Sequence, residues 1–152
     1  MEDMDHSALS KTYNIDAQTA DSAGTATAFH SGVKTRIGSI GVDGTAVDCK
    51  TSLTGKLETV LKWAHYAGKS TGIITTARVT HGVFFLGLAV RILSRNLMEY
   101  FVSATPAAAY ANVPNRDWEA YDNIHFGASQ KTDGCKDIAA QLVEENSFID
   151  VI

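Results

Sequence analysis

Two stretches of this chain repeat one pattern, an amphipathic helix followed by a short apolar strand, and this repeat constrains the fold most. In the first stretch, the apolar residues keep the i, i+3, i+4, i+7 spacing of a helix: Leu57, Val60, Leu61 and Ala64. Gly68 ends that helix and a β-prone run follows at 72–76. The second stretch repeats the spacing at Cys135, Ile138, Ala139 and Leu142, with a strand expected at 148–152. Two such units predict an α/β fold with a mostly parallel central sheet flanked by helices.

Composition limits the class of protein. With 152 residues, of which 45% are hydrophobic and 20% charged, the chain matches one globular domain or part of a larger one. The net charge of -4 and the scattered Lys and Arg argue against nucleic acid as a partner. The acidic start at 1–6 is not that of a secretory signal peptide. Polar, glycine-containing stretches at 32–55 and 112–133 are expected to form loops and edges on the surface.

The segment 82–103 is unusually apolar. Charged and polar residues interrupt it too often for a convincing transmembrane helix. Arg91, Arg95 and Glu99 recur every four residues, so an amphipathic helix lying on a membrane or on a partner protein is the alternative.

The run at 21–28 places Ser22 at the expected start of a helix of very small residues. Free backbone N–H groups and the positive end of the helix dipole favour an anion there, so a nucleophilic serine could meet a phosphate. The alternative is ordinary N-capping by Asp21 or Ser22.

Cys49 and Cys135 lie too far apart in sequence for a local metal site. They form either a long-range disulfide or two unrelated thiols. A bridge would remove denatured-state entropy worth about 4 to 5 kcal/mol and would imply an oxidising compartment.

Several motifs, taken together and in order, resemble the alkaline phosphatase family. They are the runs 8–14, 21–28, 67–72, 75–81, 104–111, 115–118 and 134–139. The resemblance covers 5–81 and 104–152, and it implies a partial alkaline-phosphatase-like fold, a single domain over 1–152 that is truncated at both ends.

The resemblance implies hydrolysis of phosphate monoesters through a covalent phosphoserine. Ser22 matches the nucleophile, Asp21 the residue that orients the site, and Arg116 the phosphate-binding arginine, whose planar fork can hold two oxygens at once. The family uses two zinc ions, one holding the serine as an alkoxide and one stabilising the leaving oxygen.

The resemblance also implies a magnesium ion. Thr105 matches its hydroxyl ligand, and His81 matches a position beside that ion. The family pairs the cysteines that match Cys49 and Cys135, which implies a disulfide. It also implies a homodimer at the cell exterior, either extracellular or attached to the plasma membrane by a GPI anchor that this chain does not carry.

The chain departs from the family in two ways. The family's histidine is followed at once by the motif at 104–106, whereas here 82–103 separates His81 from Thr105. We hypothesise that 82–103 is a retained short intron or a gene-model error, because its removal restores both the motif and the frame.

The second departure is length, since the family's zinc-ligating segments are not found. The five histidines show no H-x-x-x-H spacing. We therefore expect this fragment to be inactive alone. The alternatives are a truncated non-catalytic isoform that uses an 82–103 helix to bind a membrane or partner, and a nonproductive product without a stable fold.

Overall fold

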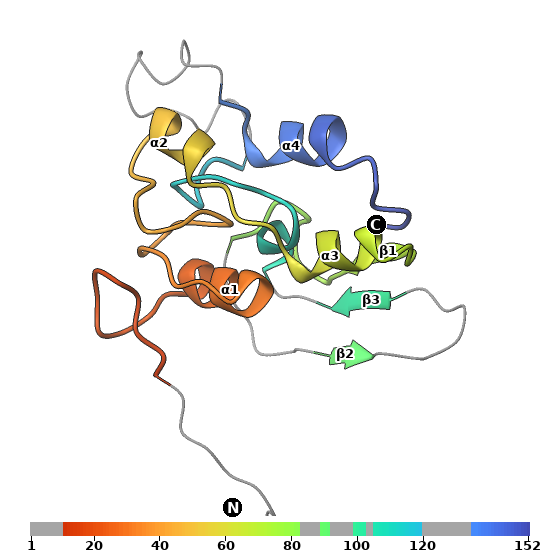
Figure 1. The fold of residues 1–152 in the computed structure, drawn as a ribbon, viewed down its shortest axis with the longest axis horizontal. Helices are drawn as coiled ribbons and strands as arrows, with labels where there is room; N and C mark the ends of the chain where they lie inside the picture. The colour runs from red at the N-terminus through yellow and green to blue at the C-terminus, as the bar shows by residue number, and fades with distance from the viewer. Residues whose placement is uncertain (1–10, 83–88, 92–98, 103–104, 120–134) are drawn as a thin grey trace, which may run out of the picture.

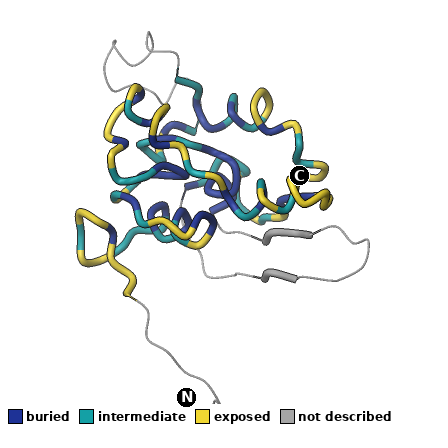
Figure 2. The backbone as a smooth tube through the Cα atoms, viewed as in Figure 1, coloured by how far each residue is buried: buried dark blue, intermediate teal, exposed yellow. Residues whose placement is uncertain are grey.

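The computed structural model describes residues 11–82, 89–91, 99–102, 105–119 and 135–152. In chain order its elements are α1 (Ser22–Ser31), α2 (Cys49–Thr54), α3 (Val60–Tyr66), β1 (Thr71–Ile74), β2 (Ala89–Arg91), β3 (Glu99–Val102), the 3-10 helix η1 (Pro106–Ala109) and α4 (Ile138–Glu145). In Figure 1, α2 and α4 lie along one side of the molecule and α1 along the opposite side. This arrangement encloses the most buried backbone, drawn dark blue in Figure 2.

The first predicted helix-strand unit is confirmed. Helix α3 begins only after Thr59, whose extended backbone makes it the N-cap, and β1 follows the turn at Gly68. Gly68 adopts φ +72°, a left-handed conformation that glycine enters without steric cost.

The second unit is confirmed for its helix and only partly for its strand. Helix α4 begins after Asp137, whose carboxylate accepts a hydrogen bond from the Ala140 N–H. The predicted strand at 148–152 forms one parallel bridge, between Val151 and Gly72, in place of a full ladder. The carboxylate of Asp150 accepts a hydrogen bond from the Thr71 N–H at 2.8 Å. In a longer ladder this N–H would donate to a backbone carbonyl of the neighbouring strand.

The described sheet has three strands in the order β1-β3-β2. Strand β3 pairs parallel with β1 and antiparallel with β2. The sheet is therefore mixed over the described residues, and a mostly parallel sheet remains a prediction for the fold beyond them.

The helical interpretation of 82–103 is wrong for the part that the structure describes. Arg91 lies in β2 and Glu99 in β3, so the two residues do not share a helix face, while Arg95 lies outside the described residues. Aromatic and β-branched residues in β3, such as Tyr100 and Val102, favour strand over helix. Within the described residues, none of the helices combines the length and apolarity needed to cross a membrane.

The stretch at 32–55 is not entirely loop, because it contains α2. Asp48 caps this helix by accepting from the Thr51 N–H at 2.8 Å, and the Thr51 side chain in turn bonds the Asp48 N–H. This reciprocal pair forms a capping box, which stabilises a short helix within a polar stretch.

The core is built on small residues. Alanines of α1 pack with the alanines of η1, and both are fully or almost fully buried: Ala23, Ala26, Ala107, Ala108 and Ala109. Small side chains let the two backbones approach closely, and Leu61, Ile73 and Ile138 join them from α3, β1 and α4. The helix of small residues expected near Ser22 is thus a buried packing surface as well as the support of that serine.

Candidate functional site

Asp21, and not Ser22, caps helix α1. The Asp21 carboxylate accepts from the Gly24 N–H at 3.0 Å and from the Asn14 side-chain amide at 2.9 Å. Ser22 is the first residue of the helix. Because Asp21 performs the capping, the Ser22 hydroxyl is left for other partners.

Arg116 joins Asp21 and Ser22 from 95 and 94 residues away in sequence, respectively. Its Nη1 donates to Oδ2 of Asp21 at 3.1 Å and to Oγ of Ser22 at 3.0 Å. The backbone is tied as well, because the Arg116 N–H donates to the Gly38 carbonyl at 2.7 Å and the Gly38 N–H donates to Asp21 Oδ2 at 2.9 Å. The structure therefore brings together three of the residues predicted from the sequence.

The free edge of the Arg116 guanidinium is the main chemical feature of this site. Within the described residues, Nε and Nη2 of Arg116 donate to no protein group, and the side chain keeps 21% of its surface exposed. This pair of N–H groups matches the spacing of two oxygens of a carboxylate or phosphate. The arrangement can therefore hold an oxyanion beside the Ser22 hydroxyl.

The electrostatics keep Asp21 ionised. Burial alone raises the pKa of the Asp21 carboxyl, but hydrogen bonds from Gly24, Asn14, Gly38 and Arg116 outweigh it and leave the pKa below its ordinary value. The ionised carboxylate fixes the Arg116 side chain and neutralises part of its charge.

Gly82 completes the surroundings of Ser22, although it was not among the residues predicted for the site. The Ser22 hydroxyl donates to the Gly82 carbonyl at 3.4 Å. Gly82 is buried, and a Cβ at this position would lie 2.8 Å from Cβ of Arg116 and 2.9 Å from Cδ1 of Ile40. In this chain, a side chain at position 82 would therefore have to displace Arg116 or Ile40.

His81 lies next to Gly82 but contacts a different set of residues. Its Nδ1 is 3.1 Å from Nη2 of Arg78 and 3.8 Å from Oε1 of Glu119. Glu119 also binds Arg78 through both carboxylate oxygens, at 2.7 and 2.9 Å. Neither Arg78 nor Glu119 was among the residues predicted for the site, because nothing in the local sequence links them.

Thr105 is buried at the start of η1, where its carbonyl accepts from the Ala108 N–H at 3.1 Å. The contacts of His81 within the described residues go to Arg78 and Glu119 and not to Thr105. The places of Thr105 as a magnesium ligand and of His81 beside that ion stay predictions.

No group of three or more His, Cys, Asp or Glu side chains that could hold a metal ion occurs among the residues described. The donor set that zinc prefers is thus not assembled by these residues. They do not fit a zinc ion by themselves.

The predicted disulfide is confirmed. Cys49 at the start of α2 and Cys135 just before α4 are bonded, with their Cα atoms 5.8 Å apart. The bridge links two segments that are separated by 86 residues in sequence.

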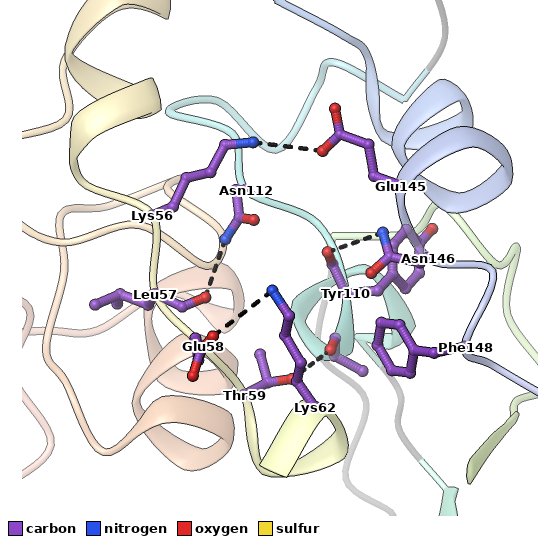
Figure 3. Close-up of a pocket in the computed structure, with 11 residues that line it drawn as sticks. Lys56, Leu57, Glu58, Thr59, Lys62, Tyr110, Asn112, Glu145, Asn146 and Phe148 are labelled. Atoms are coloured by element: carbon purple, nitrogen blue, oxygen red, sulfur yellow. Dashed lines mark hydrogen bonds and ion pairs between the residues drawn. The ribbon is translucent and has the colours of Figure 1, made fainter. Parts of the chain in front are cut away.

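A cavity of about 260 Å³ lies elsewhere, between the start of α3, η1 and the end of α4 (Figure 3). Its lining carries both signs of charge, with Lys56 facing Glu145 at 3.4 Å and Lys62 facing Glu58 at 3.7 Å. The residues that line this cavity do not include Asp21, Ser22 or Arg116.

Comparison with known proteins points to one family. A family model described as alkaline phosphatase matches residues 1–99. Over 147 residues the chain is 45% identical to an alkaline phosphatase of Gadus morhua, covering 95% of this chain and 26% of that protein. It is 42% identical over 147 residues to the tissue-nonspecific isozyme of alkaline phosphatase from Homo sapiens, covering 95% of this chain and 24% of the relative.

Solved structures agree with this similarity. A cold-active alkaline phosphatase from Shewanella sp. aligns with a TM-score of 0.55 and 26% identity, over 93% of this chain and 24% of that chain. An alkaline phosphatase from the Antarctic bacterium TAB5 aligns with a TM-score of 0.51 and 22% identity, over 89% of this chain and 34% of that one, which bears on the fold alone. The chain spans about a quarter of the length of the curated relatives that it matches.

Proposed function

This chain belongs to the alkaline phosphatase family, and on that premise we propose that it supplies the nucleophile and the phosphate-binding arginine of a phosphomonoesterase. The reaction is hydrolysis of phosphate monoesters through a phosphoserine at Ser22. The free Nε and Nη2 edge of Arg116, set beside the Ser22 hydroxyl, is the observation that carries this proposal.

Each residue has one role in the proposal. Ser22 attacks the phosphorus, Arg116 holds two non-bridging oxygens with its fork, and Asp21 fixes Arg116 and the start of α1. In the complete protein, Thr105 would provide a hydroxyl ligand for magnesium and His81 would lie beside that ion, while two bound zinc ions would supply the activation of the serine and of the leaving group. We derive no step through these metals from the described residues, because those residues do not form a zinc site.

Residues 1–152 alone are proposed to be inactive. A serine hydroxyl is a weak nucleophile unless a base or a metal removes its proton. In the described residues the partners of Ser22 Oγ are the Arg116 guanidinium and the Gly82 carbonyl, and a guanidinium cannot accept a proton.

The proposal for the complete protein includes the remaining family properties. They are a single domain of which 1–152 is part, a mostly parallel central sheet, a homodimer, and a place outside the cell or on its surface through a GPI anchor. The segment 82–103 is proposed to be a retained intron or gene-model error. Sequencing transcripts across the junction of residues 81 and 104 tests it, and finding only transcripts that contain the segment would refute it.

Phosphate binding tests the site in the chain as it exists. We expect inorganic phosphate to shift the NMR resonance of the Arg116 Nε–H, and Arg116→Lys to weaken binding about tenfold or more, since charge-assisted hydrogen bonds contribute about 1.5–3 kcal/mol each. Arg36→Lys is the matched control, because Arg36 donates through Nε to the Gly44 carbonyl and contacts neither Asp21 nor Ser22. Equal weakening by both variants would contradict the proposed site.

Catalysis is tested separately. The 152-residue chain supplied with zinc and magnesium should not hydrolyse a phosphate ester in a zinc-dependent manner. Robust turnover that Ser22→Ala abolishes would overturn the proposed inactivity while supporting the nucleophile.

A further inference from the structure

Glu119 joins the loop at 78–82 to the turn at 116–119. Its Oε1 accepts from Nη2 of Arg78 at 2.7 Å, and its Oε2 accepts from Nε of Arg78 at 2.9 Å and from the Thr80 hydroxyl at 2.8 Å. The Glu119 side chain is 18% exposed, whereas that of Arg78 is 66% exposed. Two parallel bonds from one guanidinium fix direction as well as distance, so this contact restrains the geometry of both loops.

The two loops carry residues that surround Ser22. The loop 78–82 ends at Gly82, whose carbonyl accepts from Ser22, and the turn 116–119 begins at Arg116. A second bond supports the same loop, because the Tyr110 hydroxyl donates to the Val79 carbonyl at 2.9 Å. Glu119 therefore acts where a small shift would change the spacing between Gly82, Ser22 and Arg116.

The same arginine also sets the tautomer of the neutral His81 ring. Nη2 of Arg78 lies 3.1 Å from Nδ1 of His81, and a guanidinium can only donate hydrogen bonds. Nδ1 must therefore be the acceptor, which places the proton of the neutral ring on Nε2. Within the described residues Nε2 has no partner, and the side chain is 23% exposed.

We propose that Arg78 and Glu119 are positioning residues that hold His81 as the Nε2–H tautomer, so that the ring presents a single N–H donor, on Nε2, to an incoming ligand. The consequence for phosphate esters rests on the proposed function, whereas the tautomer itself does not.

The tautomer is measured directly by ¹⁵N NMR of the imidazole in the 152-residue chain at pH 9, in the alkaline range where imidazole rings are neutral. In the unmodified chain, His81 should show a protonated Nε2 and an unprotonated Nδ1. Glu119→Gln and Arg78→Gln should both lose this single pattern and give a mixture of tautomers. Glu144→Gln is the matched control, since Glu144 is an exposed carboxylate on α4 that pairs with Lys136.

A charge reversal separates positioning from simple structural support. Arg78→Glu combined with Glu119→Arg restores an ion pair between the loops but now presents an acceptor to Nδ1. We expect the His81 proton to move to Nδ1 in this double variant. A double variant that keeps Nε2–H, or an unmodified chain with Nδ1–H or a mixture, would overturn the proposal.

The result is distinguishable from a failure of the proposed function, because the tautomer is read without phosphate. The expected tautomer in a chain that does not bind phosphate would leave this inference standing and count against the phosphate site. If phosphate binds in a manner that depends on Arg116 but His81 carries its proton on Nδ1, the phosphate site would stand and this inference would fall.

Discussion

Lowering the pH should destabilise this chain through one histidine, His30, in the last turn of α1. His30 is only 4% exposed, and burial lowers its pKa from 6.5 to about 4 because the charged imidazolium loses its hydration. Between these two pKa values the unfolded chain binds a proton at this residue and the folded chain does not. The folded state is therefore fully favoured above about pH 6.5 and loses stability as the pH falls toward 4.

The size of the effect follows from the two pKa values. They differ by about 2.5, and each unit corresponds to about 1.36 kcal/mol, so the full loss is about 3.4 kcal/mol. At pH 5, His30 is protonated in most of the unfolded chains but in few of the folded ones. About 2 kcal/mol of the unfolding free energy is therefore already lost at this pH. This is a large share of the stability of a typical domain.

Urea unfolding at several pH values between 4 and 8, for the unmodified chain and for His30→Gln, measures the effect. Other groups also titrate in this range, so the quantity to follow is the difference in unfolding free energy between the two proteins. That difference should change by about 2 kcal/mol between pH 8 and pH 5.

A difference that stays constant over this range would refute the reasoning, because a glutamine cannot titrate and any contribution of His30 must appear in it. If His30→Gln does not fold, an NMR titration of His30 in the unmodified chain serves instead. A midpoint near 6.5 would then contradict the burial argument.

Three further predictions concern stability and the site. Replacing both Cys49 and Cys135 by Ala should lower the free energy of unfolding in urea by about 4.5 kcal/mol, because the bridge closes a separation of 86 residues. A reducing agent should destabilise the unmodified chain but not the variant. Equal stability of the unmodified chain and the variant would contradict the entropic argument. Gly82→Ala should lower the free energy of unfolding by about 1–3 kcal/mol and weaken phosphate binding, since the new Cβ would clash with Arg116 and Ile40. An unchanged phosphate affinity would show that Gly82 does not shape the site. Asp21→Ala should lower the free energy of unfolding by about 1–2 kcal/mol through the lost cap, whereas Asp21→Asn should retain the bond to Gly24. Because the pKa of Asp21 is lowered in the folded chain, the stability lost in Asp21→Ala should shrink as the pH falls below about 3.8, and a pH-independent loss would contradict this pKa argument.

The sequence predicted those helices whose formation depends on residues close together in the chain. The spacing of apolar residues around Leu61 and Ile138 was enough to predict α3 and α4, because a helix buries the same face every three to four residues. The helix at Ser22 was likewise expected from its small residues and its polar cap. The predicted strand at 148–152 forms only one bridge, and there the Asp150 side chain, not a backbone carbonyl, accepts from the Thr71 N–H.

The interpretation of 82–103 shows where periodicity misleads. A charge at every fourth position is compatible with a helix, but the same residues also suit strands when aromatic and β-branched neighbours dominate. Pairing of β3 with β1 decided the outcome, and that contact joins residues nearly thirty apart in the chain.

Sequence by itself determined the small-residue helix that begins at Ser22, the two later helices, and the family to which the motifs belong. Only the tertiary structure decided that Arg116 meets Asp21 and Ser22, that a side chain at position 82 would have to displace Arg116 or Ile40, and that Glu119 fixes Arg78 against His81. The reason is physical: caps and periodicity depend on residues within one or two turns, whereas these contacts depend on which distant segments the packed core brings together.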